Sequence, residues 1–391
     1  MNYVGVDVGK KYFECWDQRK RAIQKVENTK RGVEEFLSQL KKDDVLVIDP
    51  AGGYEKNLIR AAAKKGVTVY VGDNYATSKL SKIFHRGKTD SLDAKNMCLR
   101  GEKGLLKETQ LYTQDQKTWV VEDLMEEYKA AEKSSALNRN HTVKLLDEIL
   151  PGIHILGSGP AALKFYLEHL TPQGIEKLQS GGLEEVRKTL RRYHWKLEKK
   201  AEAAWEVISR YKEEGAAEFK LKMLGTYTQR LLQDLIAIKE IKEKLKEELK
   251  NMEGVEKALK IPGVGTITIA SIIATAGRVE KFRTAKDLER FLGMDLVPRE
   301  SGQHKGKRKI SKKGNGTARK HIYLAALAAT RQDTSPFHKY YLQKIGKGKK
   351  PALVAVMRKL LRTIYTVWKN RLDYNPNLVG TGAPTVTAPV Q

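Results

Sequence analysis

The sequence predicts a chain that combines an α/β domain with all-α regions, and three observations support this. Strand-like runs alternate with helices over roughly the first hundred residues, charged helical segments fill the middle, and glycine turns separate helices in the last third. Strand–helix–strand alternation is typical of an α/β domain with a mixed sheet. Because 391 residues exceed one domain of ordinary size, we expect a mixed-sheet domain over 1–112, a helical linker over 113–254, a mostly helical domain over 255–374 and a disordered tail over 375–391.

The elements of the first domain follow from the spacing of apolar residues. Four short apolar runs are predicted strands, at residues 3–8, 11–17, 45–48 and 67–71. The run at 45–48 is apolar throughout, which is typical of a strand buried on both faces. Two stretches with apolar side chains at helical spacing are predicted helices, at residues 31–40 and 58–65.

A heptad pattern marks the end of the helical middle region. From Leu221 to Met252, ten positions are separated alternately by three and four residues, and eight of them are apolar. This spacing is typical of a coiled-coil seam, so we expect a coiled coil over 221–252 whose partner helix belongs to the same chain or to a second copy. The alternative is a long helix packed on its own domain. Thr228 and Lys242 are polar seam positions, and such residues fix helix register at a cost in stability.

A glycine turn begins the last third of the chain. Ile261-Pro262-Gly263-Val264-Gly265 precedes an apolar helical stretch, in an arrangement that resembles a helix-hairpin-helix. Backbone N–H groups at Gly263 and Gly265 would then meet a nucleic-acid phosphate at a helix N-terminus. The alternative is a tight turn in which glycine supplies a positive φ angle.

The charge balance restricts the partners. Lys and Arg total 73 and Asp and Glu total 47, so the net charge is +26. Such a surface attracts polyanions, with nucleic acid as the first candidate and an acidic membrane surface as the second. No window approaches the ~18 consecutive apolar residues of a spanning helix, and no secretory leader is recognisable. Only Cys15 and Cys98 occur, which excludes a disulfide framework and a Cys-rich zinc site. We therefore expect a soluble, intracellular nucleic-acid-binding protein without a membrane partner.

Positive charge is most concentrated just after Ser301. No acidic residue occurs from 301 to 332, and residues 304–320 hold eight Lys or Arg in 17 positions. Such a run is either a solvated face or a strip that binds phosphates, and its alternation also indicates a hairpin strand. The expected nucleic-acid-binding side chains are Arg299, Lys305, Lys307, Arg308, Lys309, Lys312, Lys313, Arg319 and Lys320.

Four carboxylates of the first domain are candidate metal ligands. Asp7 lies within a predicted strand, Asp49 directly follows the run at 45–48, and Asp90 and Asp93 are three residues apart, which places them on one side of a helix. Gathered in one place, four carboxylates repel each other unless a cation neutralises them, and Mg²⁺ prefers such oxygen ligands. The alternatives are structural: Asp90 as a helix N-cap with Asp93 at N3, and Asp49 as the start of a turn.

These motifs, in this order along the chain, resemble one family. Residues 4–9, 49–54 and 88–94 resemble the RuvC-like, DEDD-type domain of insertion-sequence-110 family transposases. Residues 261–265, 291–293, 296–299, 301–302 and 310–315 are similar to the C-terminal transposase domain of that family. The second acidic residue of the family is usually Glu, whereas this chain has Asp49, with Glu55 as the alternative.

The resemblance implies a fold, an activity and partners. The first domain is expected to be RNase H-like and to bind Mg²⁺ through the four aspartates. The protein is expected to be a transposase that cuts and rejoins target and donor DNA, with Ser301 as the nucleophile that forms a phosphoserine intermediate; Ser311 is the rival serine. A structured non-coding guide RNA (a bridge RNA) is also implied. So is a homodimer or homotetramer in which the acidic cluster of one subunit meets the serine of another, in the nucleoid-associated cytoplasm of a prokaryotic cell.

Three other interpretations stay open. A metal-dependent RNase H-like junction nuclease would cleave strands without forming a protein–DNA adduct. A non-catalytic scaffold for structured RNA or DNA would show no metal dependence. An actin-like or sugar-kinase-like ATPase is suggested by Asp7-Val8-Gly9-Lys10, but the chain lacks the further glycine-rich phosphate loops that such a fold needs.

Overall fold

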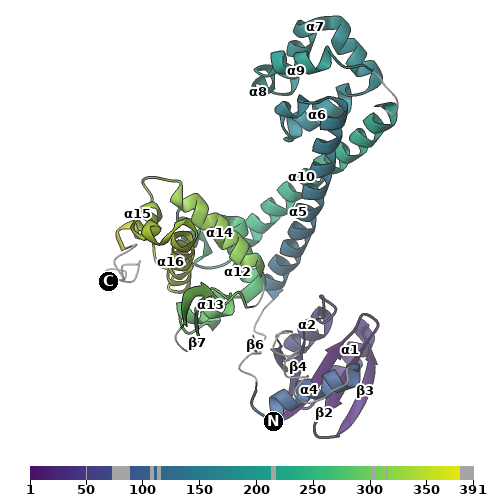
Figure 1. Cartoon of the computed structure of the whole chain (residues 1–391). Helices are drawn as coiled ribbons and strands as arrows, with labels where there is room; N and C mark the ends of the chain where they lie inside the picture. Colours follow the sequence, from purple (N-terminus) through teal and green to yellow (C-terminus); the bar gives the residue numbers. More distant parts are fainter. Residues whose placement is uncertain are drawn as a thin grey trace. The chain divides into compact units, whose positions relative to one another are not determined.

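The structure, a computed structural model, describes residues 1–49, 51–72, 89–105, 110–111, 116–212, 217–301, 304–313 and 316–378. At 110–111, 298–301, 304–308, 347 and 378 it describes the backbone alone. The chain divides into two compact units, Met1–Asp115 and Gln116–Gln391. The first unit runs from purple to blue in Figure 1, and the second continues to yellow.

The first unit is built around a six-stranded mixed sheet. Its strands are β1 (Asn2–Val8), β2 (Tyr12–Asp17), β3 (Ala22–Glu27), β4 (Asp44–Ile48), β5 (Thr68–Val71) and β6 (Gln110–Leu111). Their spatial order is β3-β2-β1-β4-β5-β6, with β1 antiparallel to β2 and parallel to β4. This is the predicted mixed sheet, and the RNase H-like class of the domain is confirmed. Neither β3 nor β6 was predicted, because β3 buries only Val26 and β6 has two residues.

The two faces of β1 receive different helices. Its valines are buried in a core shared with α1 (Lys30–Ser38) and α2 (Lys56–Lys64). On the opposite face, α4 (Asp90–Glu102) crosses the strand at Gly5. A Cβ at Gly5 would lie 2.0 Å from the carbonyl oxygen of Ala94, so only glycine permits this close approach of helix and strand. Gly5 therefore determines how near α4 lies to the sheet.

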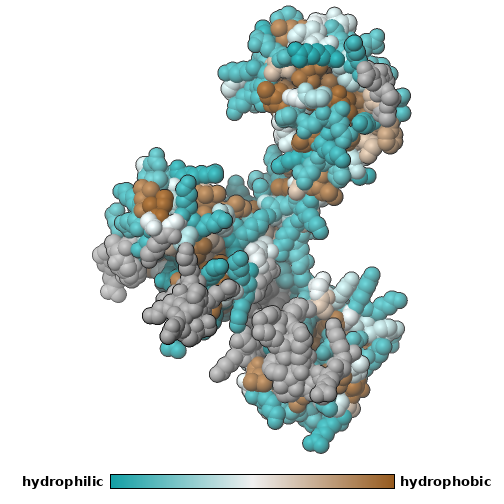
Figure 2. Space-filling model, viewed as in Figure 1, coloured by the Kyte–Doolittle hydropathy of each residue, from teal (hydrophilic) through white to brown (hydrophobic). Residues whose placement is uncertain are grey.

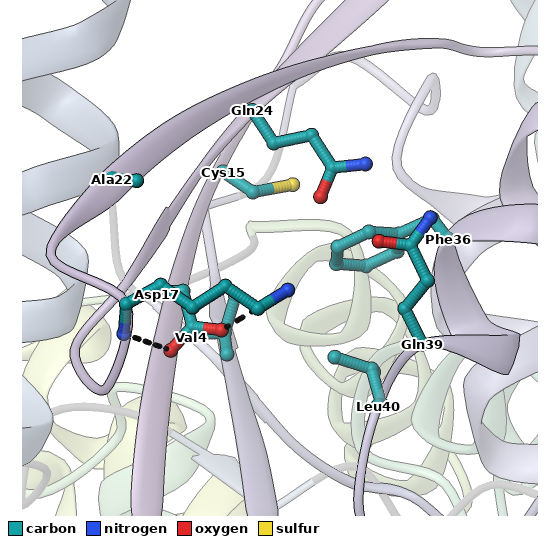
Figure 3. A pocket seen from close by; sticks show the side chains of 9 residues that line it. Val4, Cys15, Asp17, Ala22, Gln24, Phe36, Gln39 and Leu40 are labelled. Carbon is teal, nitrogen blue, oxygen red and sulfur yellow. Dashed lines mark hydrogen bonds and ion pairs between the residues drawn. The ribbon is translucent and has the colours of Figure 1, made fainter.

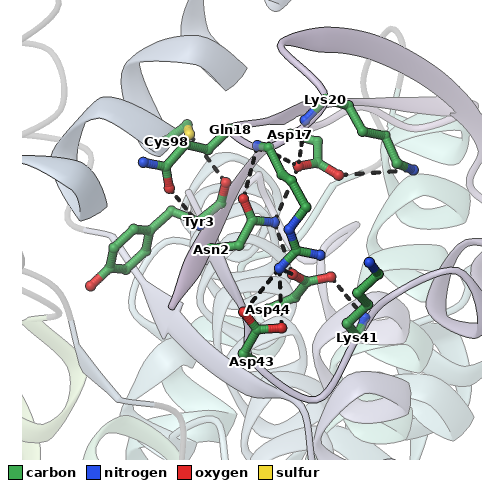
Figure 4. Close-up of polar contacts among 10 residues, drawn as sticks. Asn2, Tyr3, Asp17, Gln18, Lys20, Lys41, Asp43, Asp44 and Cys98 are labelled. Carbon is green, nitrogen blue, oxygen red and sulfur yellow. Dashed lines mark hydrogen bonds and ion pairs between the residues drawn. The ribbon is translucent and has the colours of Figure 1, made fainter.

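A polar network holds the strands together where β1 begins (Figure 4). The buried amide of Asn2 donates hydrogen bonds to Asp44 (2.8 Å) and Asp17 (3.1 Å). The guanidinium of Arg19 pairs with Asp43 (2.9 Å) and Asp44 (3.1 Å). These contacts join β1, β2 and β4, and so help to fix the register of the three central strands.

The cavity on the α1 face of the sheet is small (Figure 3). Val4, Cys15, Phe36 and Gln39 are among its lining residues, and its volume is about 40 Å³. A cavity of this size accommodates about one water molecule but no nucleotide. This face of the sheet is therefore structural, and the candidate site lies on the other face.

Two 34-residue helices, α5 (Gln116–Ile149) and α10 (Ala217–Lys250), form a helical hairpin in the second unit. They run antiparallel, with Lys220 paired to Glu148 near one end and Lys242 over the ring of Tyr128 toward the other. Most apolar seam positions of α10 are buried. The partner of the predicted coiled coil is thus α5 of the same chain, and the seam by itself does not indicate a second copy.

Each end of the helical hairpin has its own hydrophobic core. At one end the partners are η2 (Ile153–Leu156), α6 (Pro160–His169), α7 (Pro172–Tyr193), α8 (Trp195–Glu198) and α9 (Ala201–Ile208). We refer to residues 150–212 as the tip module. At the other end the partners are α11 (Val255–Ala258), α12 (Thr266–Ala276), η3 (Val279–Lys281), α13 (Ala285–Phe291), α14 (Gly316–Thr330), α15 (Pro336–Lys344) and α16 (Lys349–Lys369). Helices from the predicted linker and from the predicted C-terminal domain therefore share one core.

The remaining elements of the second unit are short. They are the strands β7 (Leu296–Ser301) and β8 (His304–Ile310), and the turns η4 (Ile345–Lys347) and η5 (Pro376–Leu378). Of the predicted tail 375–391, residues 379–391 lie outside the described residues. Within the described ranges no helix has the length and apolar character needed to cross a membrane. Among the residues that Figure 2 colours by hydropathy, hydrophilic ones predominate on the visible face.

Candidate functional site

Asp7 is the central residue of the acidic site. It lies on β1, two residues beyond Gly5 and on the same face of the sheet, and it is half-buried. Burial first, and then the carboxylates of Asp90, Asp93, Asp49 and Glu14, raise the pKa of Asp7 to about 6. The structure therefore brings the four predicted aspartates into one electrostatic neighbourhood.

The first turn of α4 supplies two of these carboxylates. Thr89 has extended backbone geometry, and its side-chain oxygen accepts a hydrogen bond from the Leu92 N–H (3.3 Å), so Thr89 is the N-cap. Asp90 and Asp93 follow within the first turn. The alternative in which Asp90 caps the helix and Asp93 completes the cap is therefore wrong, and capping does not explain either carboxylate.

Asp49 reaches the site from the end of β4. Val6 pairs with Ile48 in parallel register, and the next pair along the two strands would be Asp7 and Asp49. The carboxylate of Asp49 lies against Gly72, where a Cβ would be 1.9 Å from its Oδ1. The Nη1 of the fully buried Arg100 lies 3.7 Å from the same oxygen. Gly72 thus leaves room for the carboxylate and Arg100 offsets part of its charge, which a simple turn residue would not require.

Glu55, the alternative acidic residue, has a different role. Its Oε2 accepts hydrogen bonds from the backbone N–H groups of Ala51 and Gly53, both at 2.9 Å. Glu55 therefore holds the loop that follows Asp49. It is not among the carboxylates that raise the pKa of Asp7, whereas Asp49 is. The geometry favours Asp49 as the second acidic residue.

Glu14 is a fifth acidic residue that the sequence analysis missed. It pairs with Asp7 across β1 and β2, so the two side chains lie on the same face of the sheet. The Ser91 hydroxyl, in the first turn of α4, donates a hydrogen bond to its Oε2 (2.5 Å). The available signal was the alternation of β2, in which Phe13 and Cys15 are buried and Glu14 faces the other way.

The clustered carboxylates are the kind of ligand that Mg²⁺ prefers, but they are not arranged as a complete metal site. Burial raises the pKa of Asp7 most, and the repulsion from the other carboxylates, which adds to it, is an effect that a cation would relieve. Among the described residues, however, no three His, Cys, Asp or Glu side chains are arranged so that they could hold a metal ion. The aspartates are electrostatic neighbours, but they do not form a closed coordination shell.

The second set of candidate residues lies on the β7–β8 hairpin. Its backbone pairs run from Leu296 and Ile310 at the base to Ser301 and His304, with a bulge after Val297. This confirms the predicted hairpin strand and places Ser301 at the end of β7. The side chains of Ser301, Arg299, Lys305, Lys307 and Arg308 lie outside what the structure describes, so their roles stay predictions.

Ser311 and Arg319 hold the base of this hairpin. The Ser311 hydroxyl donates to the Asp295 carboxylate, and its backbone N–H donates to the Asp295 carbonyl (2.9 Å). Arg319 donates to the carbonyls of Leu292 (2.9 Å) and Lys313 (2.8 Å). Both side chains therefore have structural partners, which connect the hairpin to α13 and α14.

Of the other predicted phosphate-binding side chains, Lys309, Lys312 and Lys313 are exposed, whereas Lys320 pairs with Glu132 of α5 (2.7 Å). Exposure leaves the three lysines accessible to a polyanion. Phosphate binding by all four stays a prediction.

The helices and glycine turn of the predicted helix-hairpin-helix-like element are present as α11, the turn at 261–265 and α12. Gly263 has φ +81, and a Cβ there would lie 2.3 Å from the carbonyl oxygen of Ala325, so packing on α14 explains this glycine. Gly265 is the exposed N-cap of α12. Phosphate binding by this turn stays a prediction.

Comparison with known families finds two matches, in the order that the resemblance predicted. Residues 4–151 match the DEDD transposase family of IS110 elements. Residues 255–342 match the transposase family described as IS116/IS110/IS902. The two matches do not overlap, and together they span well over half of the chain.

Individual relatives agree with these families. The uncharacterized 42 kDa protein of insertion element IS900 from Mycobacterium paratuberculosis is 28% identical over 162 residues, which are 40% of each chain. The transposase for insertion sequence element IS1111A from Coxiella burnetii is 36% identical over 107 residues, 27% of this chain and 29% of that protein. The pilin gene-inverting protein of Moraxella lacunata is 26% identical over 121 residues, 30% of this chain and 38% of that protein. The matched segments thus span less than half the length of these relatives.

Proposed function

Because the chain belongs to the IS116/IS110/IS902 family of transposases, we propose that it is a DNA transposase that cuts and rejoins DNA strands. The observation that carries the proposal is the position of Asp7. It is a half-buried carboxylate on the central strand of an RNase H-like sheet, and Asp49, Asp90 and Asp93 come close enough to raise its pKa. Structural carboxylates are instead commonly paired with cations, which lowers their pKa.

The acidic cluster would hold Mg²⁺ through Asp7, Asp49, Asp90 and Asp93. Mg²⁺ bound there would activate a hydroxyl or water and stabilise the leaving oxygen of a phosphodiester. The surrounding residues orient the ligands: Arg100 restrains Asp49, and Glu14 restrains the first turn of α4 through Ser91. These restraints hold Asp49 and the first turn of α4 near Asp7, and the carboxylates would have to close around the cation when it binds.

Ser301 is the proposed nucleophile. Its Oγ would attack a DNA phosphorus, forming an Oγ–P bond while the P–O bond to one strand end breaks and that strand leaves as a protonated hydroxyl. In the second step a hydroxyl of the new partner strand attacks the phosphoserine, the Oγ–P bond breaks and the serine regains its proton. The exposed Lys309, Lys312 and Lys313 lie on and beside β8, where positive charge would stabilise the phosphate.

The proposed partners are target DNA, donor DNA and a structured guide RNA. A net charge of +26 supports binding of nucleic acid. The relative named pilin gene-inverting protein supports strand exchange, because inverting a DNA segment requires cutting and rejoining. A guide RNA would select sequence by base pairing, while the protein contacts helix shape and backbone. The aspartates and Ser301 lie in different units of the chain. In a dimer or tetramer, one subunit would supply the aspartates and another subunit would supply Ser301.

The decisive experiment tests for a covalent intermediate. The purified protein is incubated with its element's RNA, both DNAs and Mg²⁺, and denaturing gels and mass spectrometry detect a phosphoserine–DNA adduct. Ser301→Ala should abolish the adduct, whereas Ser311→Ala should retain it. Asp90→Asn should abolish recombination, and the matched control Asp43→Asn, at an exposed carboxylate paired with Arg19, should not.

Each departure from this result has a distinct meaning. An adduct that persists in Ser301→Ala overturns the serine assignment. Strand cleavage without any adduct would indicate the junction nuclease. Binding of nucleic acid without cleavage at any Mg²⁺ concentration would indicate a scaffold and overturn the proposed activity.

A further inference from the structure

Trp195, in the tip module, is a large aromatic side chain in unusual surroundings. It is the first residue of α8, and 54% of it is exposed. A tryptophan normally buries most of its surface, so an exposed one indicates a contact surface. Its indole stacks on the ring of the exposed His194, with 5.8 Å between ring centroids and 26° between planes. The two stacked, exposed rings form one aromatic platform on the surface.

Cations surround this platform. The Nζ of Lys199 lies 4.8 Å from the centroid of the Trp195 ring, and that of Lys196 lies 5.5 Å away. The last turns of α7, just before the platform, add the exposed side chains of Lys188, Arg191 and Arg192. We call these seven residues, 188, 191, 192, 194, 195, 196 and 199, the Trp195 surface.

Neighbouring acidic residues leave most of this charge uncompensated. Glu198 pairs with Arg191 (3.8 Å), and Glu202 pairs with Arg187 (3.2 Å) outside the surface. Within the described part of the chain, no carboxylate pairs with the other four cations of the Trp195 surface, Lys188, Arg192, Lys196 and Lys199. An exposed aromatic ring next to cations that have no carboxylate partner is the combination that binds a base and its flanking phosphates.

We propose that the Trp195 surface binds an unpaired stretch of RNA. The indole would stack on one base in place of the lysine ammonium groups now over its ring, and Lys196, Lys199 and the arginines of α7 would contact the flanking phosphates. Duplex DNA keeps its bases stacked inside the helix, where a surface tryptophan does not reach them, whereas loops of a structured RNA present unstacked bases. The inference rests on the proposed function in one respect, the presence of a structured RNA partner.

The location of the surface suits a binding role separate from catalysis. The tip module packs on one end of α5 and α10, whereas the β7–β8 hairpin is connected to α13 and α14, which pack at the other end. RNA held at the tip module would therefore leave the hairpin free for DNA. Trp195 is also exposed enough that its removal should not affect folding.

The test measures binding of a short RNA that requires neither guide structure nor catalysis. Fluorescence anisotropy of the full chain in EDTA follows a labelled 15-nucleotide unstructured RNA, the DNA of the same sequence and the matching duplex DNA. Trp195→Ala should weaken RNA binding about tenfold, as expected for loss of one stacked base, and Trp195→Phe should restore most of it. Lys196→Ala combined with Lys199→Ala should flatten the salt dependence. Lys164→Ala, an exposed cation on α6 outside the surface, is the matched control.

A second measurement locates the contact directly. Photocrosslinking with a 4-thiouridine RNA, followed by mass spectrometry, should place a crosslink on residues 191–200. RNA affinity unchanged in Trp195→Ala, together with no crosslink in that segment, overturns the proposal. Equal Trp195-dependent binding of single-stranded DNA overturns the assignment to RNA, and equal binding of the duplex overturns the assignment to unpaired bases. Because the assay contains no Mg²⁺ and no substrate, its outcome is independent of the transposase activity.

Discussion

The Ser91 hydroxyl donates a 2.5 Å hydrogen bond to the Glu14 carboxylate and so connects the first turn of α4 to β2. Ser91 lies between Asp90 and Asp93, and Glu14 lies beside Asp7 in the sheet. One bond thus restrains the end of the helix that carries two of the clustered carboxylates. Further along α4, the close contact of Ala94 with Gly5 holds the helix against β1.

Removal of this bond should weaken metal binding more than folding. Ser91→Ala should raise the Mg²⁺ concentration for half-maximal strand cleavage several-fold, because Asp90 and Asp93 lose a restraint, and should destabilise the protein by only about 1 kcal/mol. A magnesium titration of cleavage and a thermal melt measure the two effects. Ser38→Ala, which removes an exposed hydroxyl bonded to the Glu35 carbonyl on α1, is the matched control. An unchanged titration in Ser91→Ala would show that the bond does not position the ligands.

The contact of Gly72 with Asp49 makes a second prediction. A Cβ at residue 72 would lie 1.9 Å from Asp49 Oδ1, so Gly72→Ala must displace this carboxylate. We expect cleavage activity to fall at least tenfold while the sheet stays folded by circular dichroism. Gly225→Ala is the matched control, because nothing lies within 4 Å of its added Cβ and alanine favours helix α10, by about 0.5–1 kcal/mol. Full activity in Gly72→Ala would mean that Asp49 need not occupy this position.

The raised pKa of Asp7 makes stability depend on pH in the absence of metal. Folded Asp7 keeps its proton up to about pH 6, whereas the unfolded chain releases it near 3.8, so metal-free stability falls as the pH rises from about 4 to 6. Asp7→Asn removes this loss. In EDTA above pH 6, the melting temperature of Asp7→Asn should therefore exceed that of the wild type. The difference should correspond to about 1 kcal/mol after discounting for solvent screening. At pH 4 the two melting temperatures should not differ in this way.

The same comparison of wild type and Asp7→Asn should give a different result when Mg²⁺ is present. Mg²⁺ should offset the repulsion in the wild type and reduce its difference from Asp7→Asn above pH 6, because a bound cation favours the charged carboxylates. Melting curves of both proteins at pH 4 and 7, with and without Mg²⁺, give the difference in melting temperature under all four conditions. A difference that does not change with pH would contradict the raised pKa of Asp7.

The strands that carry the site could be predicted, but the contacts between them could not. Val4, Val6 and Val8 alternate, and the run at 45–48 is fully apolar, so the sequence pattern alone located β1 with Asp7 on it and β4 with Asp49 directly after it. The partnership of Glu14 with Asp7 depends on the register of β1 with β2, which neither strand specifies alone. The approach of Arg100 to Asp49 depends on how closely α4 packs on the sheet. This close packing is possible only because Gly5 has no Cβ.

The helical region shows the same limit at a larger scale. The heptad between Leu221 and Met252 indicated that α10 has a helical partner, because apolar seam positions must be covered. It could not indicate which helix, since α5 lies about a hundred positions earlier and has a less regular pattern, with buried polar residues such as Asn138. Trp195 had no distinguishing sequence pattern, because its importance comes from exposure.

His321 makes the last prediction, which concerns stability alone. Its side chain on α14 is buried, its ring packs on Tyr128, and no hydrogen-bond partner for its nitrogens is found among the described residues. Burial, and then the charge of Lys320, lower the pKa of His321, while Glu132 opposes this and Lys129 adds to it. The unfolded chain therefore takes up a proton near pH 6.5 that the folded state resists, and stability is lost as the pH falls below that value.

His321→Phe should remove this loss while keeping the ring against Tyr128. Between pH 7 and pH 5 the melting temperature of the wild type should fall more than that of the variant, by roughly 2–4 °C for each kcal/mol involved. Scanning calorimetry at the two pH values measures the difference, and the variant's transposition at pH 7 should match that of the wild type, because His321 is in the helical core and the clustered aspartates are in the first unit. Parallel pH profiles for the two proteins would show that His321 is protonated as easily in the folded state as in the unfolded chain.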